Sequence, residues 1–522
     1  MNKVFAERLK ALADQGPADI LAGGLKGVEK ESLRVSPTGY LSPRPHPIAL
    51  GSALTNKYLT TDFSEALLEF ITPAFSHTWE TLHFLTDIHQ FTYAHLADEL
   101  LWAASMPCVI TQDGEIPLAQ YGSSNVAKMK TVYRNGLGYR YGRNMQTIAG
   151  IHFNYSLPKS FWSVFQEMEK CDRDVNAFRS AHYLGLVRNF RRFGWLVLYL
   201  FGASPALCKS FIGGSVVNLP ELDGESFFEP YGTSLRMSDL GYTSNTQAAI
   251  NISLDDLDSY VRDLSAAIDT PEPAYEKIGV RVNGEYRQLS ANKLQIENEY
   301  YSPVRPKRVA YSGERPTAAL QRGGIEYVEI RSLDLNIFDP VGVNQNTMRF
   351  MEAFLIYCVL SDSPLLDDTA CEEAERNQAG TSKSGRDPEF RLLRQGKKVT
   401  VRVWAEEILE GVRAVAEVID RGGSSSDYAQ ATEAQLELIR TPEATPSARI
   451  LSELHNGKTG FFRYALSCAQ QHKEYFAALA PLSPARIDMF EKEVNESIKR
   501  QAEIEASDEQ TFEEYLAAYF AS

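Results

Sequence analysis

The sequence predicts an α+β fold around a largely antiparallel sheet, and two observations lead to this prediction. Short segments typical of strands are scattered among longer helical ones, without the regular strand–helix–strand alternation that builds a parallel sheet. After about residue 363 the composition changes, and polar stretches separate long helical patterns. We therefore expect a mixed core over residues 1–365 and a helical extension over residues 366–522.

The elements of the expected core follow in chain order. Residues 1–15 are amphipathic and predict a helix. We then expect strands at 27–35 and 67–72, a helix at 77–100, a strand at 150–155, helices at 160–203, a loop-rich stretch at 213–255, a helix at 254–268, and strands at 278–282 and 326–334. Residues 106–158 are rich in Gly, Tyr and Asn, and only their last part predicts a strand.

In the extension, two segments interrupt the helical pattern. Residues 372–398 are polar and rich in Gly, Ser and charge, and residues 421–447 contain a GGSSS run and two prolines. Both compositions are typical of exposed connections between helices.

The charge balance excludes several classes of protein. The chain has 522 residues, with 53 Lys and Arg against 68 Asp and Glu, so its formal net charge is −15. A nucleic-acid-binding protein gathers basic residues to neutralise phosphates, and this sequence shows no basic patch of useful size. We therefore expect no nucleic-acid partner.

The sequence also lacks signals for a membrane or for export. Residues 1–15 have neither the apolar run nor the cleavage site of a signal peptide, and the longest apolar stretch, 193–203, is shorter than the ~20 residues of a membrane span. The six cysteines contain no CxxC pair, which favours free thiols over a zinc site or a disulfide framework. We expect a cytoplasmic monomer that does not bind membranes.

Common catalytic motifs are absent from the chain. There is no GxxxxGK[ST] loop, no GxSxG turn and no HExxH helix. These absences argue against a P-loop nucleotide site, a serine hydrolase and a zinc protease. If a nucleotide binds, it is held in another way.

The informative feature is a set of short strands that carry acids where apolar residues would be expected. Side chains two residues apart lie on the same face of a strand. By this rule the same-face pairs are Glu29 with Glu31, Glu65 with Glu69, His152 with Asn154, and Glu329 with Arg331. Either each strand turns its acids to water, or the four strands together bring several carboxylates to one half-buried site.

A shared site would have a definite chemistry. Burying a charge costs several kcal/mol unless the charge is paired or bound to a metal. Several acids around one histidine exceed the cations available nearby, and hard oxygen ligands of this kind suit Mg²⁺ or Mn²⁺. Magnesium held by carboxylates usually accompanies a phosphate-bearing substrate.

Six segments resemble one known family. GVEKESLRV, LTTDFSEALLEFITP, YRYGRNMQTIAGIHFNYSLP, TSLRMSDLGYTS, LQIENEYYSPVRPKR and GIEYVEIRSLDLN are similar to the proteobacterial glutamate–cysteine ligases (γ-glutamylcysteine synthetases). The resemblance runs in order from near the first residue to about residue 360. It implies a glutamine-synthetase-like core whose curved, largely antiparallel sheet forms a funnel.

The resemblance also implies the reaction. The family joins the γ-carboxylate of L-glutamate to the amine of L-cysteine with ATP, through a γ-glutamyl phosphate, in the first step of glutathione biosynthesis. The implied cofactor is Mg²⁺, with Mn²⁺ as an alternative, and ATP is a co-substrate.

Positions in the matching motifs imply roles for individual residues. The implied metal ligands are Glu29, Glu31, Asp62, Glu69, His152 and Glu329. Arg331, Glu329 and Asp62 are the implied catalytic residues, with Arg331 facing the transferred phosphoryl group. The implied substrate-binding residues are Phe63, Tyr133, Arg134, Gln146, Arg236, Tyr242 and Tyr301; the two arginines would contact glutamate or phosphate, and the aromatic residues would form the cysteine pocket.

Two alternatives remain at this point. The first is another carboxylate–amine ligase of the same fold that uses a different amine. The aromatic pocket is the feature that distinguishes a glutamate–cysteine ligase from such an enzyme. A catalytically silent amino-acid-binding or scaffold protein would be expected to lack one or more of the acids, whereas all the matching acids are present.

Overall fold

The computed structural model describes residues 3–15, 19–107, 110, 116–213, 217–241, 250–311, 313–423 and 425–521. Its main sheet has seven strands in these ranges, in the order β10-β11-β5-β1-β3-β2, with β4 also paired to β1. The strands are β1 (Leu25–Val35), β2 (Leu59–Thr61), β3 (Leu67–Ile71), β4 (Leu100–Leu101), β5 (Ile151–Ser156), β10 (Val304–Lys307) and β11 (Tyr327–Leu333). Every pairing between them is antiparallel, which confirms the predicted α+β class.

The register of this sheet brings the predicted acids together. Glu29 on β1 lies opposite His152 on β5, and Glu31 lies opposite Glu69 on β3. On the other side of β5, Glu329 lies opposite Asn154. The four strands β11, β5, β1 and β3 are adjacent in this order, so these polar residues form one row across the sheet.

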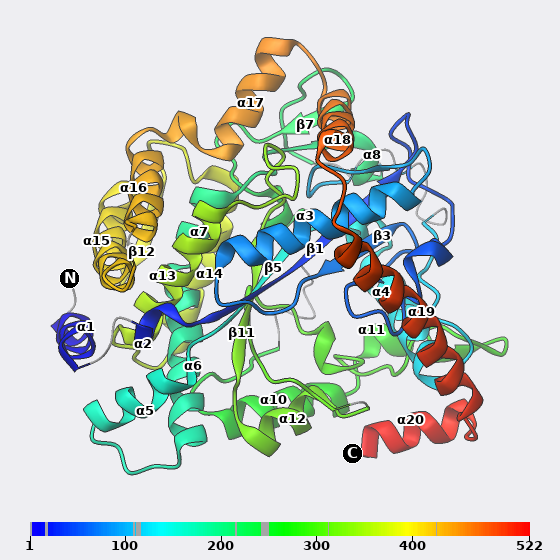
Figure 1. Ribbon diagram of the computed structural model, residues 1–522, viewed down its shortest axis with the longest axis horizontal. Helices are drawn as coiled ribbons and strands as arrows, with labels where there is room; N and C mark the ends of the chain where they lie inside the picture. The colour runs from blue at the N-terminus through cyan, green and yellow to red at the C-terminus, as the bar shows by residue number, and fades with distance from the viewer. Residues whose placement is uncertain are drawn as a thin grey trace.

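The opposite face of β1 carries lysines and is covered by helices. Figure 1 shows α3 (Thr78–His95) crossing this side of the sheet. Lys30 lies between Phe70 and α3, with its Nζ 2.8 Å from His89 Nε2, and burial lowers its pKa to about 7. Lys26 Nζ lies 2.8 Å from Glu352 Oε2 of α13 (Gln345–Leu360), and neither side chain is exposed.

Six helices of the first part were predicted: α1 (Lys3–Gln15), α3, α5 (Lys159–Met168), α6 (Val175–Phe193), α7 (Trp195–Phe201) and α10 (Leu257–Asp269). The shorter helices α2 (Asp19–Ala22), α8 (Lys209–Ile212), α11 (Pro273–Glu276) and α12 (Pro316–Gly323) were not predicted. Two long helices, α13 and one in the Gly- and Tyr-rich stretch, were also missed. The Gly- and Tyr-rich stretch contains α4 (Asn125–Tyr141), which Ser124 caps through the backbone N–H of Ala127. Polar residues and glycines on α4 hide the helical apolar pattern.

The remaining short elements surround these helices. The predicted strand at 278–282 is reduced to β8 (Arg281–Val282), which pairs only with β9 (Glu285–Tyr286) and lies outside the main sheet. Strands β6 (Ala206–Cys208) and β7 (Ser226–Phe228) form another small pair. The 3₁₀ helices are η1 (Ile48–Leu50), η3 (Asn144–Thr147), η4 (Leu235–Met237), η5 (Glu297–Glu299) and η6 (Pro442–Ala444). Cys208 is disulfide-bonded, so the expectation of free thiols is wrong for this residue.

The part after residue 366 is mainly helical. It contains α14 (Asp368–Ser384), the hairpin β12 (Arg391–Arg394) and β13 (Lys397–Thr400), α15 (Val401–Asp420), α16 (Asp427–Arg440), α17 (Pro446–Gly457), α18 (Phe461–Ala478), α19 (Pro484–Ala506) and α20 (Phe512–Ala521). The two predicted connections are wrong, because the first holds most of α14 and the hairpin, and the second holds α16 and η6. The boundary between residues 365 and 366 stays a prediction.

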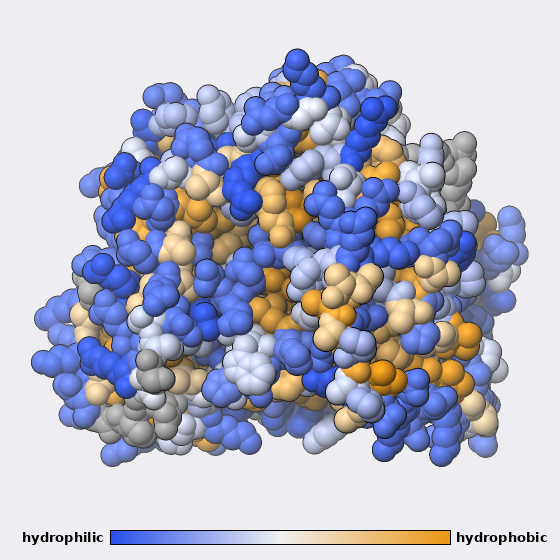
Figure 2. Space-filling model, turned by 45° about the horizontal axis from the view of Figure 1, so that its top comes forward, coloured by the Kyte–Doolittle hydropathy of each residue, from blue (hydrophilic) through white to orange (hydrophobic). Residues whose placement is uncertain are grey.

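These helices pack against the core rather than apart from it. α14 packs on α6 and α7, α15 and α16 pack on α13, and α18 and α19 pack on α3. The face shown in Figure 2 is mostly hydrophilic, with apolar side chains in scattered groups. Among the described helices, none combines the length and the apolar character that crossing a membrane requires.

Candidate active site

A cavity of about 940 Å³ lies on the acidic face of the sheet. Strands β1, β3, β5, β10 and β11 supply its floor, and α4, α14, α20 and the segment 296–303 supply its walls. Of the residues assigned roles from the sequence, all that the structure describes line this cavity. Tyr242 lies outside the described residues.

Three side chains at the centre could hold a metal ion. Glu29, His152 and Glu329 each offer one ligand atom, and these three atoms lie within 4.8 Å of one another. His152 Nδ1 is 3.0 Å from Glu29 Oε2 and 3.9 Å from Glu329 Oε1. Asn154 Nδ2 donates to the other Glu29 oxygen at 2.9 Å, so this carboxylate is held in a fixed orientation.

The other acids lie beside this group, and the positive charges near them are too few to balance their negative charges. Glu31 Oε1 is 3.9 Å from His152 Nε2, while its Oε2 accepts a hydrogen bond from the backbone N–H of Gly150 at 2.7 Å. Burial raises the pKa of Glu31. Burial also raises the pKa of Glu69 well above its usual value, and the charges of Glu29, Asp62 and Glu31 raise it further. A cation bound here would relieve both penalties.

Glu329 differs because basic residues surround it. Lys307 Nζ and Arg331 Nη1 each lie 3.3 Å from Glu329 Oε2. Burial favours the protonated acid, but these two cations and His152 outweigh it and hold the pKa of Glu329 well below its usual value. Glu329 is therefore ionised and faces both the metal-ligand group and the cations.

Arg236 reaches the same region from η4. Its Nη2 donates to the Arg331 carbonyl at 2.7 Å, and its Nη1 lies 3.5 Å from Asp334 Oδ1. Gly150 makes room for this guanidinium, because a Cβ at that position would lie 2.1 Å from Arg236 Nη2. Asp334 is itself fixed by Ser204 and Ser234, whose hydroxyls donate to it at 2.6 and 2.9 Å.

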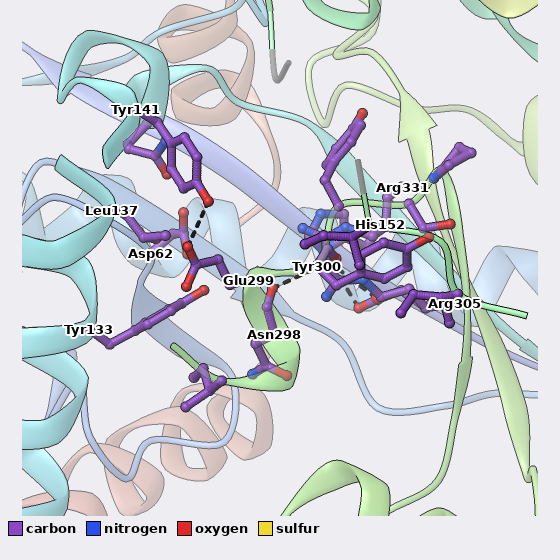
Figure 3. A pocket seen from close by; sticks show the side chains of 18 of the residues that line it. Asp62, Tyr133, Leu137, Tyr141, His152, Asn298, Glu299, Tyr300, Arg305 and Arg331 are labelled. Carbon is purple, nitrogen blue, oxygen red and sulfur yellow. Dashed lines mark hydrogen bonds and ion pairs between the residues drawn. The ribbon is translucent and has the colours of Figure 1, made fainter. Parts of the chain in front are cut away.

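Helix α4 and the β2–β3 turn form the opposite side. Arg134 Nε donates to the Asp62 carbonyl, and its guanidinium lies 4.7 Å from the centre of the Tyr121 ring. Phe63 is buried, and Tyr133 is one residue before Arg134 on the same helix. In Figure 3, Asp62 and Tyr133 lie on one side of the pocket, and His152 and Arg331 lie on the other. Tyr301, whose hydroxyl donates to Met237 Sδ at 3.1 Å, and the buried Gln146 complete the described set.

Sequence reasoning missed several cavity residues. Lys130, Arg191, Arg305, Lys307, Cys371, Glu375, Tyr515 and Tyr519 also line the space. For Arg305 and Lys307 a signal was present, because they alternate along the VRPK segment and so share a strand face. Tyr515 and Tyr519 carried none, since their contact with the site depends on how α20 folds back against α4.

One acid singled out from the sequence lies elsewhere. Glu65 does not line the cavity; its two oxygens accept hydrogen bonds from the backbone N–H groups of His46 and Gln120, each at 2.5 Å. The period-two rule fails for Glu65 and Glu69 because Glu65 precedes β3, in the turn after β2.

Comparison with known proteins identifies the family. The family model described as glutamate-cysteine ligase matches residues 9–380. A glutamate–cysteine ligase of Alcanivorax borkumensis is 49% identical over 527 residues, covering 99% of each chain, and one of Pseudomonas putida is 46% identical over 522 residues, covering 100% of this chain and 99% of its own.

Solved structures agree with the sequence comparison. The crystal structure of a Francisella tularensis glutamate–cysteine ligase in complex with AMP superposes with a TM-score of 0.90 at 34% identity, covering 96% of this chain and 98% of that chain. A bifunctional glutathione synthetase of Pasteurella multocida superposes with a TM-score of 0.73 at 25% identity, covering 91% of this chain and 55% of that chain. The chain therefore belongs to the glutamate–cysteine ligase family.

Proposed function

We propose that this chain joins the γ-carboxylate of L-glutamate to the amine of L-cysteine at the expense of ATP, in the first step of glutathione biosynthesis. The observation that carries the proposal is the cavity itself: in a member of this family, one space contains a row of acids, several arginines and a set of aromatic side chains. Use of ATP is supported by the similar Francisella enzyme, which was crystallised with AMP.

The chemistry explains why these residue types occur together. A carboxylate is a poor acyl donor, so transfer of the ATP γ-phosphoryl group to the glutamate side chain is needed to give an acyl phosphate that the amine can attack. That transfer brings two anions together and spreads charge over the phosphoryl oxygens. Groups fixed in advance around that charge lower the barrier most effectively.

The donor set fits Mg²⁺, with Mn²⁺ as an alternative. Glu29, His152 and Glu329 would hold one ion, and Glu31, Glu69 and Asp62 would hold further ions, since burial and like charges raise the pKa values of Glu31 and Glu69. When bound, the metal neutralises the phosphates and the transferred group. The sheet that carries these ligands would have the funnel-shaped curvature of a glutamine-synthetase-like core.

The remaining residues would bind and orient the substrates. Arg331 faces the cavity beside Glu329, which suits contact with the transferred phosphoryl group, and Arg236 fixes its backbone. Arg134 would contact a substrate carboxylate or phosphate. Phe63, Tyr133, Tyr242 and Tyr301 would enclose the cysteine side chain, with Gln146 beside them; such S–aromatic contacts contribute only ~0.3–1.5 kcal/mol each, so discrimination between amines should be modest.

One assay tests the proposal and its alternative. ADP release is measured with glutamate plus cysteine, 2-aminobutyrate or glycine, with Mg²⁺, with Mn²⁺ and with a chelator. We expect release with cysteine, less with 2-aminobutyrate and little with glycine, in each case dependent on glutamate and metal. Preference for another amine would favour a different carboxylate–amine ligase, and no release with any amine would favour a silent binding protein. We also propose that the protein is cytoplasmic and that it is a monomer. Sedimentation of the purified protein would check the oligomeric state.

A further inference from the structure

Helix α20 contributes to the wall of the cavity although it lies far along the chain from the acidic strands. Tyr515 and Tyr519 line the same space as Glu29 and Glu329. Four residues apart, the two tyrosines lie on one face of the helix. Figure 1 shows α20, drawn in red, at the edge of the molecule, and the helix packs against α4.

This face of α20 packs on the same apolar cluster as Tyr133, which is already assigned to the amine pocket. Phe512 forms a buried cluster with Met129 and Val132 of α4 and with Leu289 and Ile296. The half-buried side chains packed on this cluster include Tyr133, Tyr515, Leu516 and Tyr519. The α20 tyrosines therefore belong to the side of the cavity with Tyr133, on α4, and not to the sheet that carries the acids.

Polar contacts hold the start of α20: Asn125 Nδ2 of α4 donates to the Gln510 carbonyl at 2.8 Å, and the Tyr286 hydroxyl donates to Glu513 at 2.8 Å. Thr511 and Glu514 form a reciprocal cap, in which Thr511 N–H donates to Glu514 at 2.9 Å and Glu514 N–H donates to Thr511 at 3.3 Å. Glu513 pairs with Arg281 at 3.1 Å, but both side chains are more than half exposed, so this pair contributes little. A helix this short is marginal by itself. Beyond these contacts at its start, α20 is held by its aromatic face, which is also the face that lines the cavity.

We propose that Tyr515 and Tyr519 form the outer wall of the amine-substrate pocket and determine affinity for the amine. The inference rests on the proposed function and adds two specificity-determining residues to it. In the proposed function the glutamate γ-carboxylate and the transferred phosphoryl group react at the acids and Arg331 of the sheet, so removing these phenols should weaken binding of the amine far more than binding of glutamate or ATP.

The test uses full-length Tyr515→Ala and Tyr519→Ala variants. We expect KM for cysteine to rise about tenfold, which corresponds to the binding free energy of one good contact. KM for glutamate and KM for ATP should stay within about twofold of wild type, and kcat should change less than KM for cysteine does. Tyr519→Phe keeps the ring and should restore most of the affinity. Equal increases in KM for all three substrates, or no increase in KM for cysteine, would overturn the inference.

Leu516→Ala is the matched control. Leu516 packs on the same cluster from the same helix but does not line the cavity. We expect this variant to melt at a lower temperature with all three KM values unchanged; a selective rise in KM for cysteine here would show that loosening α20 suffices, and would overturn a direct role of the phenols. If wild type releases no ADP with any amine, the proposed function fails and the inference with it. ADP release by wild type with unchanged KM values in the tyrosine variants refutes the inference alone.

Discussion

At the scale of single residues, Glu329 connects the two halves of the site, because it contacts both the metal-ligand group and the cations Lys307 and Arg331. Glu329→Gln keeps the shape and removes the charge. We expect most activity to be lost, and the Mg²⁺ concentration for half-maximal rate to rise, because one ligand charge is missing. Rates measured against Mg²⁺ concentration, together with thermal melting, check this. Near-normal turnover at saturating Mg²⁺ with unchanged melting would refute a role in metal binding.

Arg331 offers a second test at this scale. Arg331→Lys replaces a planar fork by a point charge, and we expect a large fall in kcat with smaller changes in the KM values, because the fork matters most while phosphoryl transfer takes place. Steady-state rates with each substrate varied in turn measure the split. A kcat within about twofold of wild type would instead indicate an ordinary ion pair with Glu329, worth ~0–1 kcal/mol.

At the scale of elements, β1 is joined to α13 by the buried pair Lys26–Glu352. Glu352 also accepts a hydrogen bond from the Tyr428 hydroxyl at 2.6 Å. Glu352→Ala would leave a buried lysine without its counter-charge, and we expect a loss of about 3–5 kcal/mol in the free energy of unfolding. Denaturant unfolding measures it. Glu7→Ala removes one partner of the exposed Lys3–Glu7 pair and should change stability by less than ~1 kcal/mol; similar losses in both variants would contradict the argument.

The helices and strands also show how much of the fold could be predicted from the sequence. The strands that carry Glu29, His152 and Glu329 were predicted because a period of two and strong family motifs describe them. Helix α4 was missed because its many polar residues, together with Gly136 and Gly138, obscure the helical apolar pattern, so the local sequence resembles a loop. The contribution of α20 could not be predicted, since packing between residues more than 350 positions apart, such as Phe512 and Met129, leaves no trace in either segment alone.

At the scale of the whole molecule, acid should destabilise the fold through partly buried, neutral histidines. Burial lowers the pKa values of His46, His182 and His472 to about 4. Unfolding returns each to its usual value near 6.5, so the unfolded chain binds more protons and stability falls as pH drops from about 6.5 towards 4. Denaturant unfolding across this range measures the slope. His182→Phe should reduce the slope, because the ring lies between Phe165 and Phe178 and phenylalanine fits there without titrating; an unchanged slope would refute a contribution from His182.

The predicted division after residue 365 is also a question about the whole molecule. α14 carries Cys371 and Glu375 into the cavity, and α15 and α16 cover the buried helix α13. We expect a chain that ends at residue 365 to be insoluble or inactive, because it exposes α13 and lacks two walls of the cavity. Expression and the ADP-release assay check this, with the full chain as control. An active, folded fragment would establish residues 1–365 as an independent catalytic domain.

The alternation of acids and lysines along β1 affects how the chain avoids misfolding. Its acids point into the cavity, and Lys26 and Lys30 point into the opposite layer of helices. A slip of one residue would exchange the two sets, leaving Glu29 and Glu31 among apolar and aromatic side chains. The residues proposed for the chemistry thus also penalise incorrect strand alignment. Replacing several of these acids with apolar residues at once would remove this safeguard, and kinetically trapped, misaligned chains should then accumulate during refolding.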